Sequence, residues 1–288
     1  MSVRVFAPAK INLTLEVGRP RADGRHPLQS AVVFADVGDW VEAEDDADDS
    51  VLFHIRGPFA PILREQPTNI VLDAIGVMQR MNPVERGGRI TLDKHLPVAS
   101  GIGGGSSDAA ATLKALRALW KVDVSDDGLA ALSRELGADV PVCVGAHTAW
   151  MTGAGETFGP LTPPPLHCVL VNALKPLSTA EVYRQFDRMD LGDAFAERAA
   201  PTWSTVDEAI SGIRAIGNDL VAPARALMPE IGELLDELAR DPRTLCAAMS
   251  GSGATVFALC ENAEIAEALA GDWSRARPSH WIKAARLG

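Results

Sequence analysis

Residues 97–108 read PVASGIGGGSSD, and the stretch leads into Ala109, Leu113, Leu116 and Trp120 at helical spacing. Three adjacent glycines are costly inside a helix or a strand, which indicates a local backbone requirement for them. A loop that ends at a helix N-terminus presents free amide groups and the positive end of the helix dipole. The stretch therefore predicts a binding site for phosphate.

The hydroxyl groups of Ser106 and Ser107 are candidate ligands for a phosphate oxygen or a magnesium ion. The alternative interpretation is a flexible turn in which Ser107 caps the helix. The stretch is not a Walker A motif, because no Gly-Lys-Ser/Thr closes it, and Ser106 stands where a dinucleotide fingerprint has its last glycine. A nucleophilic Ser106 would need a glycine at Asp108 and a partner histidine that nothing singles out.

Two ionisable residues are candidates for chemistry near such a phosphate. Asp139 lies among small and apolar residues shortly before Pro141, where we expect extended backbone, and it is either a general base or a loop carboxylate. Lys10 precedes a run of alternating apolar residues and shares its parity with Asn12, so both are expected on the polar face of a strand. Lys10 is either the cation beside Asp139 or a surface lysine.

Length and composition favour a two-domain globular protein. The chain has 288 residues, of which 47% are hydrophobic and 23% charged, and its net charge of −11 disfavours nucleic-acid binding. None of the four cysteines forms a C-x-x-C pair, and the six histidines show no metal-ligand spacing. No apolar run has the length of a signal peptide or a membrane span, so we expect a cytoplasmic protein without a membrane partner.

The secondary-structure pattern predicts an α+β chain. Three prolines at 163–165 indicate a connector, so we place a boundary near residues 152–165 and assign domains to residues 1–155 and 156–288. Strands are expected at 31–34, 40–44, 51–55, 89–92 and 142–144, and helices from about residue 69, from residue 108 and over 229–240. Capping boxes are expected at Ser178 and Thr205.

Several motifs together resemble a known family. Pro8-Ala9-Lys10-Ile11-Asn12, the stretch 97–110 and Ser250-Gly251-Ser252-Gly253-Ala254 resemble the three motifs of the GHMP kinase superfamily. Within it, residues 22–26 (ADGRH), 137–141 (GADVP) and 218–220 (NDL) are similar to the branch that phosphorylates 4-diphosphocytidyl-2-C-methyl-D-erythritol, a step of the isoprenoid route that avoids mevalonate. The resemblance implies an N-terminal domain similar to ribosomal S5 domain 2, a ferredoxin-like C-terminal domain and an active site in the cleft between them.

The resemblance also implies roles for individual residues. The catalytic pair falls on Lys10 and Asp139. The ATP loop falls on Pro97, Val98, Ala99, Ser100, Gly101, Ile102, Gly103, Gly104, Gly105, Ser106 and Ser107, with Asn69 and Lys94 near the adenosine. The substrate residues are Asn12, Arg25, His26, Thr179 and Tyr183. Arg25 replaces the family's usual aromatic residue, so either Arg25 or Tyr183 is expected to stack on the cytosine. Residues 98–100 are also less rich in glycine than the family's loop.

The implied reaction transfers the γ-phosphoryl group of ATP, with Mg²⁺, to the 2-hydroxyl group of this small-molecule substrate. Asp139 would accept the hydroxyl proton, and Lys10 would orient the hydroxyl and neutralise developing charge. Two alternatives remain open: a related kinase acting on homoserine or a mevalonate-type alcohol, and a non-catalytic nucleotide-binding module. The resemblance leaves open whether the chain forms a homodimer.

Overall fold

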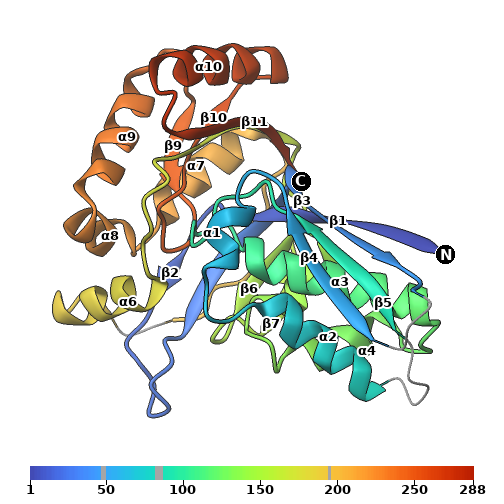
Figure 1. Cartoon of the computed structure of the whole chain (residues 1–288). Coiled ribbons are helices and arrows are strands. Elements are labelled where there is room, and N and C mark those ends of the chain that lie inside the picture. Colours follow the sequence, from blue (N-terminus) through green and yellow to red (C-terminus); the bar gives the residue numbers. More distant parts are fainter. Residues whose placement is uncertain (47–49, 82–86, 194–195) are drawn as a thin grey trace. The chain divides into compact units, whose positions relative to one another are not determined.

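The computed structural model describes residues 1–46, 50–81, 87–193 and 196–288 (Figure 1). The chain forms two compact units that interleave along the sequence. The first unit contains Met1–Ala9, Gly38–Val98 and Gly103–Ala146, and the second contains Lys10–Val37, Ala99–Ile102 and His147–Gly288. Strands β1 (Ser2–Asn12) and β3 (Leu28–Glu44) each contribute to both units. The division of the sequence at residues 155 and 156 stays a prediction.

The first unit is built on a sheet covered by helices. Strand β5 (Gly88–Asp93) pairs in parallel with β4 (Val51–Arg56) and antiparallel with residues 40–44 of β3. The helices are α1 (Ala60–Arg64), α2 (Ile70–Met81), α3 (Gly104–Trp120), α4 (Asp126–Ser133) and α5 (Val140–Gly145). Figure 1 shows α2, α3 and α4 on one side of β4 and β5. Ile90 and Leu92 of β5 and Leu113 and Leu116 of α3 are fully buried in this core.

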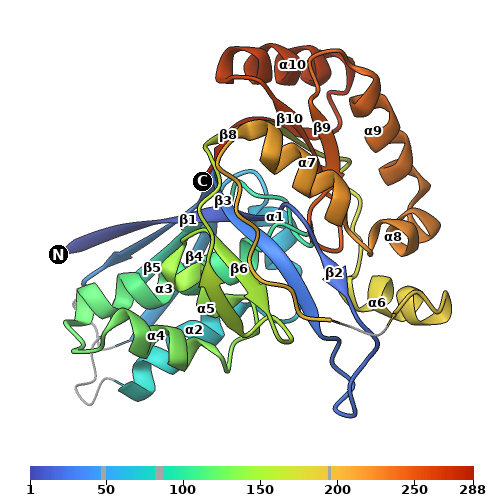
Figure 2. The ribbon, with the colours of Figure 1, turned by 180° about the vertical axis from the view of Figure 1, so that it is seen from behind.

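The second unit contains an antiparallel sheet in the order β11-β8-β10-β9. These strands are β8 (Leu166–Asn172), β9 (Cys246–Met249), β10 (Val256–Cys260) and β11 (Trp281–Leu287). Helices α9 (Pro229–Arg240) and α10 (Ala263–Ala276) pack against it, as Figure 2 shows from behind. The remaining elements are β2 (Glu16–Val17), β6 (Ala149–Thr152), β7 (Thr157–Pro160), α6 (Thr179–Arg188), α7 (Val206–Ile216) and α8 (Val221–Leu227).

Most of the predicted elements are confirmed, and the segment around Asp139 is the main exception. Residues 142–144 lie in helix α5 and not in a strand, with Pro141 in its first turn, where a proline needs no N–H donor. A short apolar run has the same pattern in a buried strand and a buried helix. Asp139 precedes this helix with φ −84° and ψ −13°, so its expected extended conformation is also wrong. The restriction that proline imposes acts on Val140, its immediate neighbour.

The two expected capping boxes have different outcomes. Thr205 accepts from the main-chain N–H of Glu208, and the Glu208 carboxylate accepts from the N–H of Thr205, so this capping box is confirmed. Ser178 precedes α6 in extended conformation, but its side chain makes no capping hydrogen bond, so the box at Ser178 is wrong. Within the four described ranges, no helix is long and apolar enough to cross a membrane.

Candidate active site

The glycine-rich stretch ends at the N-terminus of α3, which begins four residues earlier than the pattern predicts. Gly103 is the N-cap residue with a left-handed φ of 62°, and no side chain caps the helix. The backbone requirement predicted for the three adjacent glycines is therefore confirmed at Gly103, and Gly101, which lies outside this triplet, also has a positive φ of 74°. No acidic residue lies in the first turn of α3. The first amides of this helix therefore keep their capacity to bind an anion.

The last two glycines of the run, Gly104 and Gly105, have different surroundings within the first unit. A Cβ atom at Gly104 would lie 3.1 Å from Nζ of Lys94, so a larger residue would press on a buried ammonium group. A Cβ atom at Gly105 would meet only Cγ2 of Ile70, at an ordinary 3.6 Å. Gly105 is exposed, and the contacts of the described residues do not demand a glycine there. Close approach of a ligand to the backbone would account for it.

The second glycine cluster, residues 250–254, is hydrogen-bonded to the part of the loop that lies in the same unit. Thr255 donates to the Ser100 carbonyl oxygen from its N–H at 3.1 Å and from its hydroxyl group at 2.6 Å. The Ser250 hydroxyl donates to the Gly101 carbonyl oxygen at 3.0 Å. A Cβ atom at Gly101 would collide with the carbonyl oxygen of Gly253. The two glycine clusters therefore lie backbone against backbone.

The N-terminal motif meets the same cluster. The N–H of Lys10 donates to the Ile102 carbonyl oxygen at 2.9 Å, and the N–H of Asn12 donates to the Ser250 hydroxyl at 3.1 Å. The Asn12 side chain donates to the hydroxyl of Ser30 at 2.7 Å. Lys10 and Asn12 are each only 3% exposed, so the expected polar strand face is buried. The second unit thus joins parts of all three motifs.

Asp139 lies in the first unit, in the N-cap position of α5, and is half-buried. Helix α5 packs against α3, the helix that carries the glycine run at its start. Lys10 belongs to the second unit. The pairing of these two side chains stays a prediction.

The predicted substrate residues His26, Tyr183, Thr179 and Arg25 all lie in the second unit. The ring of His26 lies beside Tyr183, with centroids 5.0 Å apart, and its Nδ1 lies 2.9 Å from the Gly18 carbonyl oxygen. The hydroxyl of Thr179 lies 2.8 Å from that of Ser252, at the start of α6. Arg25 is exposed on a turn. The N–H of Arg21 donates to the Arg25 carbonyl oxygen, and the N–H of Arg25 donates to the Asp23 carboxylate.

Asn69 and Lys94, the residues expected near the adenosine, both lie in the first unit. The Asn69 side chain accepts from the N–H of Val71 at 3.0 Å, at the start of α2. Nζ of Lys94 is 2.6 Å from Oδ2 of Asp39 and 2.6 Å from Oδ2 of Asp108. Lys94 is only 2% exposed. Its ammonium group is thus held inside the protein, and a direct adenosine contact stays a prediction.

The sequence motifs did not include Asp39 and Thr255, which hold the backbone of their units in place. Ser250 and Asn218 were named only as members of motifs, and their hydrogen bonds give each a specific role. Asn218 donates to the carbonyl oxygens of Met249 at 2.8 Å and Gly251 at 2.9 Å. The only sequence signal for Asp39 is a carboxylate between apolar residues of a strand.

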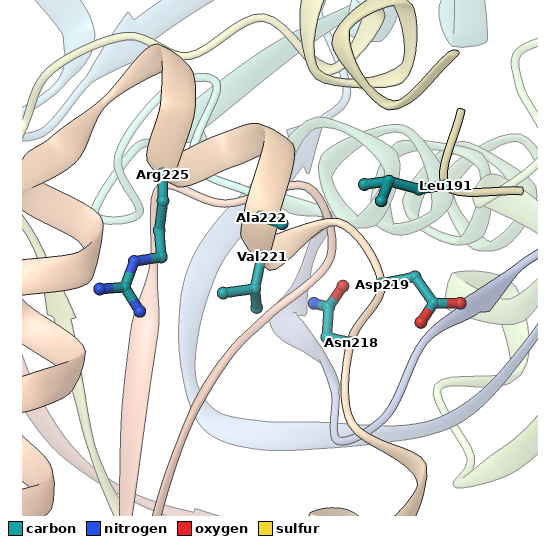
Figure 3. Close-up of a pocket in the computed structure, with 6 residues that line it drawn as sticks. All are labelled: Leu191, Asn218, Asp219, Val221, Ala222 and Arg225. Atoms are coloured by element: carbon teal, nitrogen blue, oxygen red, sulfur yellow. The ribbon is translucent and has the colours of Figure 1, made fainter. Parts of the chain in front are cut away.

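Asn218 also lines a cavity of about 600 Å³ in the second unit (Figure 3). Its other lining residues are Leu191, Asp219, Val221, Ala222 and Arg225. Figure 3 shows the guanidinium of Arg225 and the carboxylate of Asp219 at opposite ends of this set. None of the site residues predicted from the sequence lines this cavity.

Among the residues that the structure describes, no three side chains of His, Cys, Asp or Glu gather as ligands for a metal ion. The hydroxyl of Ser107 donates to the Pro8 carbonyl oxygen at 2.6 Å, and this residue is 2% exposed. Ser106 is half-buried in the first turn of α3. Of the two serines, Ser106 is therefore the better placed to meet a ligand.

Comparisons with known proteins identify the family of this chain. The family model for the GHMP kinases N terminal domain matches residues 69–146, and that for the GHMP kinases C terminal domain matches residues 199–279. The 4-diphosphocytidyl-2-C-methyl-D-erythritol kinase of Parvibaculum lavamentivorans is 44% identical over 283 residues, which are 98% of this chain and 97% of that protein.

Solved structures of GHMP kinases are also similar to this chain. The crystal structure of a 4-(cytidine 5'-diphospho)-2C-methyl-D-erythritol kinase is similar with a TM-score of 0.79 and 33% identity over 99% of each chain. A homoserine kinase from Cytophaga hutchinsonii shares the fold, with a TM-score of 0.70 and 18% identity over 98% of this chain and 94% of that one. The chain has the two-domain α+β fold of these kinases. It belongs to the GHMP kinases, in the family of the 4-diphosphocytidyl-2-C-methyl-D-erythritol kinases.

Proposed function

We propose that the chain transfers the γ-phosphoryl group of ATP to the 2-hydroxyl group of 4-diphosphocytidyl-2-C-methyl-D-erythritol, with ADP as the second product. The observation that carries this proposal is the 44% identity to a 4-diphosphocytidyl-2-C-methyl-D-erythritol kinase over 98% of the chain. The chain is an ATP-dependent phosphotransferase of the isoprenoid route that avoids mevalonate.

The first step is to hold the phosphates of ATP. The N-terminus of α3 has no side-chain cap and no acidic residue in its first turn, which suits a polyanion. Gly105 leaves its backbone open to close approach, since a Cβ atom there would meet only Ile70. Main-chain amides then bind the phosphates without added cationic side chains, which suits a chain with a net charge of −11.

A magnesium ion fits this site. Mg²⁺ bound to nucleotides keeps several waters and takes further ligands from the phosphates, so it would need few ligands from the protein. Ser106 would offer one hydroxyl, because the Ser107 hydroxyl is donated to Pro8. When bound, the ion neutralises charge on the phosphate oxygens.

The acceptor hydroxyl needs a base and a cation. Asp139 accepts the proton of the hydroxyl group as it attacks, and the ammonium of Lys10 orients the hydroxyl and offsets the charge that develops between donor and acceptor. The main chain of Lys10 is fixed by its hydrogen bond to Ile102 inside the ATP loop. This bond supports a place for Lys10 beside the ATP loop, and its pairing with Asp139 is part of the proposal.

The cytidine end of the substrate is assigned to His26 and Tyr183, which lie side by side. Asn12, Thr179 and Arg25 complete the proposed contacts. Tyr183 is the only tyrosine in the chain and stands in α6, whose first residue Thr179 is bonded to Ser252 of the second glycine cluster. We assign the stacking on cytosine to Tyr183, because Arg25 is exposed on a turn.

A kinase acting on homoserine or on a mevalonate-type alcohol is not favoured. The homoserine kinase that shares the fold is 18% identical, against 44% for the cytidyl kinase. Location in the cytoplasm stays a prediction, and a homodimer stays the possibility that the sequence left open.

The decisive test follows ADP release with each acceptor in turn. We expect ADP only with the cytidyl substrate, and phosphorus NMR of the product should show a new monophosphate ester at the 2-position. Faster ADP release with homoserine or mevalonate would contradict the assignment. ADP release that does not depend on any acceptor would point to an ATPase.

A further inference from the structure

We propose that Lys94, Asp39 and Asp108 form a buried loop clamp, a positioning cluster that fixes both ends of the glycine-rich loop and thereby sets the affinity for ATP. The proposal rests on the proposed function only in taking the nucleotide as the ligand of this loop. All three residues belong to the first unit, so the clamp is complete within it.

The clamp has one cation between two aspartate side chains. Nζ of Lys94 is 2.6 Å from Oδ2 of each aspartate, and the three side chains are 3%, 0% and 2% exposed. Burial lowers the pKa of Lys94, but its contacts with Asp108 and Asp39 raise it in balance above its ordinary value, so the ammonium group stays charged. The charged ammonium group therefore donates a hydrogen bond to each aspartate, and all three side chains are buried.

The clamp reaches the entry of the loop through Asp39. Its Oδ1 accepts from the main-chain N–H groups of His95 at 2.5 Å and Leu96 at 2.8 Å. These two residues immediately precede Pro97, where the loop begins. The backbone of Lys94 is held as well, because its N–H donates to the carbonyl oxygen of Arg56 at 2.8 Å.

The exit of the loop is reached through Asp108. This residue is the fifth of α3, one turn after the amides proposed to bind phosphate. The ammonium group of Lys94 lies against the first residue of the same helix, since a Cβ atom at Gly104 would be 3.1 Å away from Nζ. A single ammonium group therefore ties the start of α3 to the strand end that leads into the loop.

Stability alone does not explain such a cluster. A buried ion pair is often no more stabilising than apolar side chains of the same size, because its desolvation opposes its attraction. Within the described part of the chain, Oδ1 of Asp108 has no hydrogen-bond partner, so the clamp carries a further polar cost. What an ion cluster offers over an apolar contact is fixed direction and distance, and the nucleotide loop needs both.

The experiment compares three variants of α3. Asp108→Ala removes the acceptor for Lys94 but leaves the Lys94–Asp39 pair, so the protein is expected to fold. Asp108→Asn keeps an acceptor oxygen. Leu116→Ala is the matched control, because it removes a fully buried side chain from the same helix two turns further on.

The dissociation constant of a non-hydrolysable ATP analogue, adenylyl imidodiphosphate, is measured by calorimetry together with KM for each substrate. We expect Asp108→Ala to raise the dissociation constant and KM for ATP by about tenfold or more, with KM for the cytidyl substrate changed by less than about threefold. Asp108→Asn should recover most of this loss. Leu116→Ala should lower the melting temperature without weakening the binding of the analogue.

Two results would overturn the clamp: wild-type affinity for the analogue in Asp108→Ala, or an equal loss of affinity in Leu116→Ala at equal loss of stability. Wild-type affinity for the analogue in a folded Lys94→Met variant would overturn the clamp in the same way. Failure of the proposed function looks different, because wild-type protein would then bind the analogue without phosphorylating the cytidyl substrate.

Discussion

The main-chain N–H of Asn12 donates to the hydroxyl of Ser250 at 3.1 Å, although 238 residues separate the two in sequence. The same hydroxyl donates to the Gly101 carbonyl oxygen, so Ser250 links the N-terminal motif to the ATP loop inside the second unit. Ser250 is fully buried. One hydroxyl group therefore serves two segments that both belong to the proposed site.

Replacing Ser250 by Ala should weaken both folding and nucleotide binding. The N–H of Asn12 and the carbonyl oxygen of Gly101 would lose their buried partner, at a cost of about 1–3 kcal/mol in the free energy of unfolding. We expect KM for ATP to rise as the loop loses its tie. Ser125→Ala is the control, because it removes the N-cap of α4 at a cost of about 1 kcal/mol. An equal rise of KM in both variants would contradict the role of Ser250.

Asp139→Asn and Lys10→Ala should each lower kcat by about 10²–10⁴-fold, as expected for the loss of a general base or of its charge partner. Binding of a non-hydrolysable ATP analogue should persist in both variants, and calorimetry checks it. Near-normal turnover in either variant would reject its assigned role. The double variant should be little worse than the weaker single variant, because residues that act as one unit are not additive.

Gly105→Ala distinguishes an effect on ATP binding from an effect on stability. The added Cβ atom would meet only Ile70 at 3.6 Å, so the protein should be as stable as the wild type or up to about 1 kcal/mol more stable, since alanine favours a helix. Affinity for ATP should fall, because the methyl group occupies the space that a phosphate needs. Thermal unfolding and calorimetry measure the two effects, and unchanged affinity would contradict a phosphate site at this glycine.

Tyr183→Ala and Arg25→Ala distinguish the two candidates for stacking on the cytosine. Loss of a base–aromatic contact costs about 1–3 kcal/mol, so Tyr183→Ala should raise KM for the cytidyl substrate by about tenfold or more. Arg25→Ala should have the smaller effect, and KM for ATP should stay constant in both. The reverse order would assign the stacking to the arginine plane.

The pH dependence of stability should report on Asp108. Burial raises the pKa of its carboxyl group to about 8, opposed by Lys94 and reinforced by Asp39, from an ordinary value of 3.8. A carboxyl group that holds its proton more tightly in the folded state stabilises the protein at low pH, and this contribution is lost as the pH rises towards about 8.

The wild-type urea midpoint should therefore fall from about pH 5 to about pH 8.5 relative to that of Asp108→Asn, which has no such proton. Both groups that face Asp108, the ammonium of Lys94 and the carboxylate of Asp39, remain in the variant. Parallel curves for the two proteins would contradict the raised pKa.

The ATP loop could be predicted because its signals are local. Glycines at 101 and 103 with positive φ, followed by apolar residues at helical spacing, all lie within one short stretch of chain. Whether a short apolar segment forms a strand or a helix was less predictable. Residues 142–144 belong to a helix because Pro141 suits the first turn of one.

The loop clamp shows what a single sequence hides. Lys94 is 55 residues from Asp39 and 14 from Asp108, so no spacing rule connects them. An isolated lysine is seldom buried, so the residue type alone favours an exposed position for Lys94, and its expected place near the adenosine came only from the family resemblance. Only the fold brings the two aspartates to it and makes it an interior residue.

The contact between Gly101 and Gly253 limits how this enzyme can change. A side chain at residue 101 would strike a carbonyl oxygen, and every amino acid at residue 253 carries that oxygen. No substitution at residue 253 can make room for a side chain at residue 101, so such a side chain requires the main chain itself to shift. An inhibitor that contacts the backbone at these two glycines should therefore meet a shape that a substitution at either residue changes only by moving the main chain.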